Sequence, residues 1–241
     1  MTLDLQATVS GLVRERPPRC RVFEKLQIDY CCGGKLSLAE ACEQHELDPQ
    51  AVLQHLQESD AQPAPDEVPL IDADAMSLTD LANHIEQTHH AYLKAELPRL
   101  DAMTQKVFTL HGSTDRRLAD VRRAFVTLHE ELVGHLTKEE QILFPMIRQL
   151  ESVTGVPAAH CGSVANPIRQ MEWEHDSAGK ALAIMNGFTD GYQPPEWACN
   201  TYRAMLDGLT QLEWDLHQHI HKENNVLFPK AIRLEAERAA G

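Results

Sequence analysis

A histidine and a glutamate four residues apart, repeated in the same apolar setting, constrain the fold of this chain most. The stretch HLTKEEQILFP at 135–145 returns as HIHKENNVLFP at 219–229, with the same His, Lys, Glu, Leu, Phe and Pro. Leucines seven and three residues before the histidine recur in both copies. Residues four apart lie on one face of a helix. The repeat therefore predicts two equivalent helices, each with a His-Glu pair on one face.

The apolar stripe of each helix indicates which way the pair points. Leu128, Leu132 and Ile142 fall on the same stripe as His135 and Glu139. The same offsets give Leu212, Leu216 and Val226 around His219 and Glu223, and His175 follows Ile168 and Met171. We therefore expect both His-Glu pairs and His175 to face the interior.

Long amphipathic segments predict an all-α fold. Helical periodicity runs near 77–106, 115–150, 164–187 and 195–236, with Gly- or Pro-containing connections and no period-two runs. Four helices with such loops form an antiparallel bundle, whose interior commonly holds metal sites. Because His90 and His175 are spaced nearly as the repeat is, two helix pairs related by a pseudo-twofold axis are expected.

A Pro-rich, acidic stretch at 59–76 indicates a linker between a small helical segment, 1–58, and the bundle, 77–241. In the small segment, Ser37 and Glu40 have capping-box spacing, and Asp48 precedes Pro49 as an N-cap would. About 58 residues bury only a marginal core. Such a segment favours pairing into a homodimer.

The net charge excludes some function classes. A formal charge of −14 argues against nucleic-acid binding, because a phosphate backbone favours Lys and Arg. No apolar stretch is long enough for a bilayer, which argues against a membrane protein. The N-terminus lacks the pattern of a secretory signal. We expect a cytoplasmic protein with reduced cysteines.

Buried carboxylates and imidazoles need compensation, because each buried charge costs several kcal/mol. A pair of metal ions would supply it, with one half-site for each copy of the repeat. Imidazole mixed with carboxylate, without thiolate, favours iron or manganese over structural zinc. A single inward histidine would more often be a hydrogen-bonded core residue, so the repetition carries this interpretation.

Four stretches, HHAYLKAELPRL, HLTKEEQILFPMI, EHDSAGKAL and HIHKENNVLFPKA, resemble the metal-binding segments of hemerythrin-like bundles. More narrowly, they resemble the Repair of Iron Centres di-iron proteins, and DYCCGGKLSLAEAC resembles the ScdA-type domain that precedes the bundle there. The resemblance covers nearly the whole chain. It implies a non-haem di-iron protein that restores iron–sulfur clusters damaged by nitrosative or oxidative stress, more a repair or iron-donor protein than a turnover enzyme.

The resemblance implies a ligand set for two iron ions. It assigns the metal-binding positions to His90, His135, Glu139, His175, His219 and Glu223. The two glutamates would bridge the ions, and two histidines would complete each one. Glu131 and Glu174 are acidic neighbours that would steer ions or water, or are merely solvated charges. In the first helix the apolar phase favours His89, whereas the match through ELP favours His90, which we choose.

Cys31 and Cys32 are adjacent, and we interpret them as the chemically active residues of the small segment. The thiols would be redox-active, accept a nitrosyl or persulfide group, or hand over iron. A disulfide between neighbours is strained. Gly33 and Gly34 permit positive φ and a tight turn, which is expected to expose the thiols.

Two mechanisms stay open for such a centre. It donates iron to a damaged cluster of an iron–sulfur client protein, or it reacts with nitric oxide at open coordination positions. The alternative function is a nitric oxide or oxygen carrier or sensor without repair activity. A ferritin-like oxidase ranks last, because those sites use Glu-x-x-His spacing and this chain has His-x-x-x-Glu.

Overall fold

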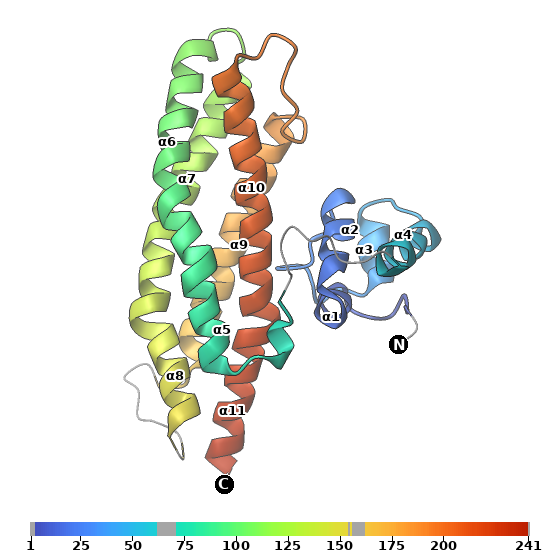
Figure 1. The fold of residues 1–241 in the computed structure, drawn as a ribbon, viewed down its shortest axis with the longest axis vertical. Coiled ribbons are helices and arrows are strands. Elements are labelled where there is room, and N and C mark those ends of the chain that lie inside the picture. Colours follow the sequence, from blue (N-terminus) through green and yellow to red (C-terminus); the bar gives the residue numbers. More distant parts are fainter. Residues whose placement is uncertain (1–2, 62–70, 154, 156–161, 241) are drawn as a thin grey trace. The chain divides into compact units, whose positions relative to one another are not determined.

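The computed structural model describes residues 3–61, 71–153, 155 and 162–240, and helices dominate these ranges (Figure 1). They divide into two compact units, one of residues 1–77 with Ile220–Lys230 and one of Leu78–His219 with Ala231–Gly241. The expected all-α class is confirmed. Part of the expected linker, 62–70, lies outside the described residues. None of the described helices has the length and apolar character needed to span a bilayer.

Four long helical rods form the bundle, and they lie side by side in Figure 1. Helix α7 packs against α6 and α9, and α5 packs against α8. Short connections between successive rods make neighbours antiparallel, so the predicted four-helix bundle is confirmed. The rods comprise α5 (Leu78–Ile85) with α6 (Ala91–His111), α7 (Arg117–Lys138) with α8 (Phe144–Ser152), α9 (Ala165–Phe188), and α10 (Asn200–Lys222) with α11 (Phe228–Ala240).

Three of the rods are interrupted by a π-helical turn, at Glu86–His90, Glu139–Leu143 and Glu223–Leu227. The last two each end at the leucine of the repeated Leu-Phe-Pro, so that Phe-Pro follows directly. Pro145 and Pro229 have no N–H to donate four residues back, which weakens regular α-helical bonding. In the first turn the Thr88 hydroxyl donates to the carbonyl of His84 at 2.7 Å instead. Such turns commonly occur at functional sites.

The π turns correct one expectation of the sequence analysis. Ile142 was expected on the buried stripe, but 46% of its surface is exposed, and Leu143 is buried instead. A π turn adds about one residue to the helix, which rotates the residues after the turn by roughly 100°. The apolar stripe therefore cannot be extended in regular α-helical phase from Leu132 across Glu139.

The first unit is a cluster of short helices: α1 (Val9–Glu15), the 3₁₀ turn Pro17–Arg19, α2 (Cys20–Lys25), α3 (Leu38–Gln44) and α4 (Pro49–Ala61). Its core gathers Val9, Leu12, Phe23, Ile28, Tyr30, Leu38 and Leu56, among others. The expected capping box is present, since Ser37 and Glu40 bond each other's backbone. Helix α4 begins at Pro49, and the Asp48 carboxylate accepts from Gln50 N at 3.0 Å.

A carboxylate from α8 caps the first rod of the bundle. The two oxygens of Glu151 accept from Leu78 N and Thr79 N, each at 2.9 Å. Burial alone would raise the pKa of the Glu151 carboxyl, but the bonds to Thr79 and Leu78 outweigh it and lower the pKa. This contact fixes where α5 begins relative to α8.

We expect Glu151→Ala to lower the free energy of unfolding by about 1 kcal/mol at neutral pH, as loss of a helix cap does. Because the folded-state pKa is lowered, the cap contributes fully above the unfolded value of about 4.3. Its contribution fades as the pH falls through the folded-state pKa. Denaturant unfolding at pH 7 and at pH 3 measures both, with the exposed Glu43→Ala as control. A difference from wild type that does not shrink at pH 3 would contradict the capping role.

Candidate metal centre

Six buried side chains converge into two overlapping groups in the bundle. One group is His90, Glu139, His219 and Glu223, and the other is His135, Glu139, His175 and Glu223. In each group one ligand atom per residue lies within 4.8 Å of the others. Both glutamates belong to both groups. Every residue that the sequence analysis named as a bundle ligand is thus brought together, and the arrangement offers two adjacent cation positions that share two carboxylates.

His135 shows how the side chains of one group are oriented. Its Nδ1 is 2.8 Å from Glu174 Oε2, and its Nε2 is 3.2 Å from Glu139 Oε2 and 3.1 Å from His175 Nε2. Lys138 also donates to Glu174. Burial would raise the pKa of the Glu174 carboxyl, but the bonds from His135 and Lys138 outweigh it and lower the pKa to about 2. The ionised carboxylate can only accept, so Nδ1 carries the proton and the Nε2 lone pair faces the centre.

His90 is held in the same way in the other group. Its Nδ1 is 2.9 Å from Glu140 Oε1, and Lys94 Nζ is 2.6 Å from the same oxygen. Burial alone would raise the pKa of the Glu140 carboxyl, but the bonds from Lys94 and His90 outweigh it and lower the pKa. His90 Nε2 then points to Glu139 Oε2 at 3.4 Å. One oxygen of Glu139 therefore lies between imidazoles from both groups, as a bridging carboxylate would.

These donors fit a metal ion. The Nε2 atoms of His135 and His175 are 3.1 Å apart. Two nitrogens bonded at about 2.1 Å to one ion, at right angles, lie about 3.0 Å apart. Imidazole nitrogens and carboxylate oxygens without sulfur are typical ligands of iron and manganese. Hydrogen bonds from the outer imidazole nitrogens to carboxylates are the usual way that metal-binding histidines are oriented.

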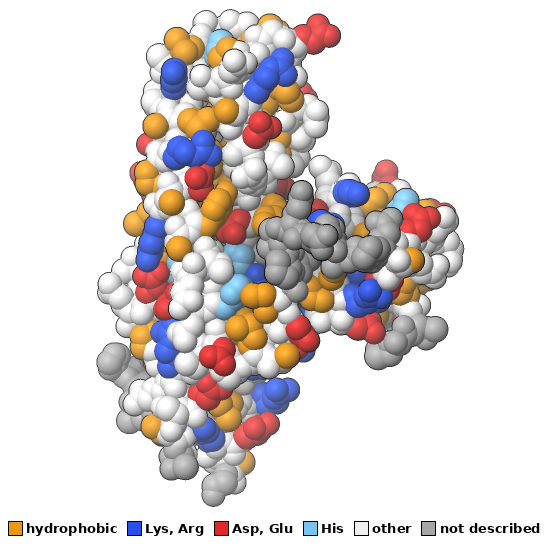
Figure 2. Space-filling view, in the orientation of Figure 1, with side chains coloured by type: hydrophobic (Ala, Val, Ile, Leu, Met, Phe, Trp, Pro, Cys, Tyr) orange, Lys and Arg blue, Asp and Glu red, His pale blue; other side chains and the backbone are white. Residues whose placement is uncertain are grey.

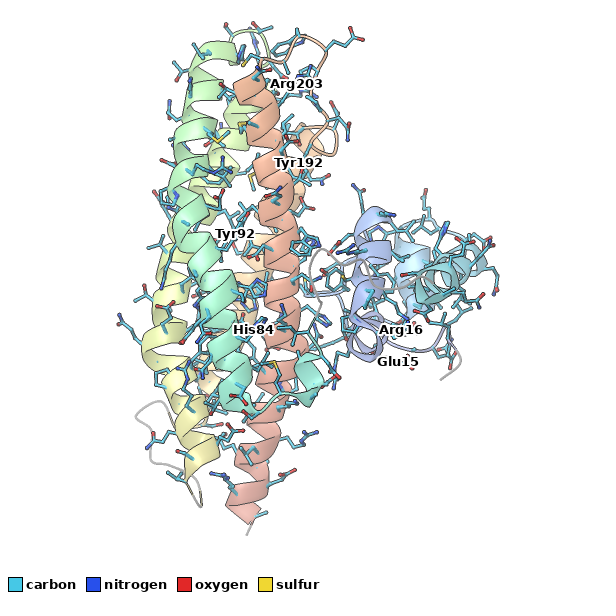
Figure 3. The ribbon with its side chains drawn as sticks, viewed as in Figure 1. Glu15, Arg16, His84, Tyr92, Tyr192 and Arg203 are labelled. Atoms are coloured by element: carbon cyan, nitrogen blue, oxygen red, sulfur yellow. The ribbon has the colours of Figure 1, made fainter. Side chains whose placement is uncertain are left out.

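His89 is buried as well but lies outside both groups. Its Nδ1 is 2.7 Å from Asp215 Oδ1, and its ring stacks on that of His219 at 5.3 Å between centroids. The ring of His84, labelled in Figure 3, meets the His89 ring edge-on, with 6.0 Å between centroids. His89 and His90 both lie in the π turn Glu86–His90, and both are buried.

The cysteine pair differs from expectation. Cys31 is buried and Cys32 half-buried, so the turn does not expose both thiols. Neither Gly33 nor Gly34 has positive φ. Their role is to provide space, because a Cβ on Gly34 would lie 2.3 Å from the carbonyl oxygen of Tyr30. Both thiols are free.

The sequence analysis missed the residues that orient the histidines. Glu140, Lys94 and Asp215 were not singled out, although Glu140 follows the repeated Glu directly. Of the two acidic neighbours that were named, Glu174 contacts His135, whereas Glu131 accepts from the Ser177 hydroxyl at 2.8 Å. Helical periodicity shows which residues share a face of one helix. It does not show contacts between helices, and these contacts join different rods.

We expect Glu140→Ala and Glu174→Ala each to weaken iron binding by about 10- to 100-fold, because the imidazole loses its orienting partner. Competition with a chromophoric chelator measures the affinity. Glu96→Ala is the matched control, since the Glu96 carboxylate pairs with Arg99 on its own helix. Wild-type affinity in both variants would contradict the role of these carboxylates.

Comparison with known proteins adds independent findings. The model of the hemerythrin HHE cation-binding domain matches residues 81–231, and ScdA_N, described as a domain of unknown function, matches residues 5–60. A protein of Enterobacter sp. (strain 638) named iron-sulfur cluster repair protein YtfE is 39% identical over 92% of this chain and 94% of its own length. Proteins of the same name from Escherichia coli O157:H7 and Yersinia pseudotuberculosis are 38% and 37% identical, over 90% and 91% of this chain and 92% and 93% of their own.

These matches cover both the bundle and the short helices of residues 5–60, and the relatives align with the chain over nearly its whole length. The chain therefore belongs to the hemerythrin HHE cation-binding family and, within it, to the family of the YtfE iron-sulfur cluster repair proteins.

Proposed function

We propose that this chain repairs iron–sulfur clusters damaged by nitrosative or oxidative stress, and that it holds two iron ions for this purpose. The observation that carries the proposal is the pair of buried groups that share Glu139 and Glu223. The family of the chain and the printed name of its relatives agree with it. The proposed ligands are His90, His135, Glu139, His175, His219 and Glu223.

When bound, the iron ions supply redox chemistry and exchangeable coordination positions. The chain's own residues do the rest. Glu140 and Glu174 keep the Nδ1 proton of His90 and His135 in place, so that each Nε2 is available as a ligand. Glu139 and Glu223 are fully buried, and so competing water is excluded from their oxygens.

Iron donation to a damaged cluster and reaction with nitric oxide both use such a site, and they are not exclusive. Cys31 and Cys32 would assist transfer or docking of the iron–sulfur client. A cytoplasmic location would place the chain with both proposed partners, the damaged iron–sulfur protein and nitric oxide. The division into 1–58, 59–76 and 77–241, and a homodimer formed through the first segment, stay predictions that limited proteolysis and light scattering test.

We expect the iron-loaded chain to restore activity to an iron–sulfur hydratase whose cluster nitric oxide has destroyed. The double variant Glu139→Gln with Glu223→Gln should hold little iron and restore none, because the shared carboxylates are lost. Circular dichroism checks that its helices remain. The matched double variant Glu43→Gln with Glu237→Gln changes two exposed glutamates and should behave as wild type.

The same assay separates the alternative, a nitric oxide or oxygen carrier. If the wild-type chain binds nitric oxide reversibly but never restores the hydratase, the carrier function is correct and the repair proposal is wrong. If the carefully purified chain contains zinc instead of iron and has no visible absorption, both the repair proposal and the carrier function are wrong.

A further inference from the structure

We propose that Asp29, Cys31 and Cys32 form a second cation site, which binds one thiophilic divalent ion such as iron(II). The inference deepens the proposed function, on which its biological sense rests, because it gives the small unit a chemical task in handling iron. It concerns residues of the first unit alone and uses none of the bundle ligands.

The three side chains already have the spacing of metal ligands. Cys31 Sγ is 3.9 Å from Cys32 Sγ and 3.1 Å from Asp29 Oδ1, and the ligand atoms all lie within 4.8 Å of one another. Two sulfurs bonded tetrahedrally to one ion at about 2.3 Å lie about 3.8 Å apart. The observed Sγ–Sγ distance therefore fits two bonds to a single ion and is far too long for a disulfide.

Backbone hydrogen bonds fix the Asp29 carboxylate in this position. Its Oδ1 accepts from Cys31 N at 2.8 Å and Cys32 N at 3.0 Å, and its Oδ2 accepts from Gly33 N at 2.8 Å. A Cβ on Gly33 would lie 3.2 Å from Oδ2, so glycine leaves the carboxylate its space. The loop thus holds both thiols around one carboxylate.

The protonation of the thiols defines the binding step. The hydrogen bond with Cys32, burial and the nearby Asp29 carboxylate raise the pKa of the Cys31 thiol well above its ordinary value. Without a cation the Cys31 thiol therefore keeps its proton. Binding breaks two S–H bonds, forms two sulfur–metal bonds and releases two protons to solvent, with no change in oxidation state. The ion's two positive charges then face three negative ones.

The site is open on one side, which suits transfer better than permanent storage. Asp29 is exposed and Cys32 half-buried, whereas Cys31 is buried. Three ligands from the chain leave at least one coordination position for water or for a ligand from a client. Structural sites for such ions are closed by four protein ligands, and sites that exchange ligands keep a position open. Two thiolates with one carboxylate favour iron(II), cobalt(II) or zinc(II) over magnesium or calcium.

The test uses the full chain with its bundle loaded with iron, kept anaerobic and reduced, and titrated with cobalt(II). We expect a thiolate-to-cobalt charge-transfer absorption that saturates at one cobalt per chain, with release of two protons, while the iron content stays constant. Cys31→Ser with Cys32→Ser should abolish the absorption. Cys199→Ser, which changes an exposed cysteine of the bundle, should leave it unchanged.

Asp29→Asn tests the carboxylate separately. Asparagine keeps an oxygen that accepts from the backbone of Cys31 and Cys32, and circular dichroism checks the fold. We expect cobalt affinity to fall by at least about tenfold, because a charged ligand is lost. Unchanged affinity would overturn the three-ligand site.

The two proposals fail in different ways. If the wild-type chain retains iron in the bundle but shows no sulfur–cobalt absorption, the second site does not exist and the repair function is untouched. If the chain binds cobalt through its thiols but its bundle holds no iron, the proposed function fails and the second site stands.

Discussion

Two carboxylates with no solvent exposure, Glu139 and Glu223, are the constraint around which the bundle is organised. A buried anion destabilises a fold by several kcal/mol unless an opposite charge or a full set of hydrogen bonds compensates. His90 and His135 turn Nε2 toward Glu139, because Glu140 and Glu174 hold their outer nitrogens. Two divalent ions would bring four positive charges to these four carboxylates. Lys94 and Lys138 pair with Glu140 and Glu174 at the edge, so cations are needed chiefly for the two buried carboxylates, Glu139 and Glu223.

Both groups of candidate ligands are buried inside the bundle. On the face shown in Figure 2, acidic and basic side chains are interspersed over the bundle, so the charge of −14 is not gathered there into one acidic field. Surface charges at such spacing are screened by salt over about 10 Å. Ion selection therefore depends on the buried donors and on how firmly they are held.

The sequence predicts the rods and the inward ligands because both follow from helical periodicity within single segments. The repeated His and Glu lie four apart, and apolar neighbours in regular phase indicate their direction. The same reasoning fails at two of the three π turns, whereas Val226 in the third is buried as expected. It placed Ile142 in the core, where Leu143 is found, and it favoured His89, whereas His90 is the one that joins a group of candidate ligands. The repeated Phe-Pro marks two of these turns, but the first is followed directly by Ala91 and Tyr92.

Helical periodicity cannot predict contacts between rods, as the carboxylates around the centre show. Glu140, on the second rod, bonds His90 on the first, and Glu174, on the third, bonds His135 on the second. Neither partner is near its histidine in sequence, so no spacing could reveal the pair. The fold of the small unit illustrates the same limit, since the need for Gly34 comes from its approach to the Tyr30 carbonyl and not from its own backbone angles.

The repeat also shows where the pseudo-twofold symmetry ends. Glu140 follows the proposed ligand Glu139, but Asn224 follows Glu223; likewise Glu174 precedes His175, but His89 precedes His90. The proposed ligands thus repeat, while the carboxylates next to them do not. Yet each group contains a histidine whose Nδ1 contacts a neighbouring carboxylate, His90 in one and His135 in the other. Had both carboxylates belonged to the same group, the two cation positions would differ by two charges. Their placement on different groups gives each position one such anion, which favours two ions of the same kind.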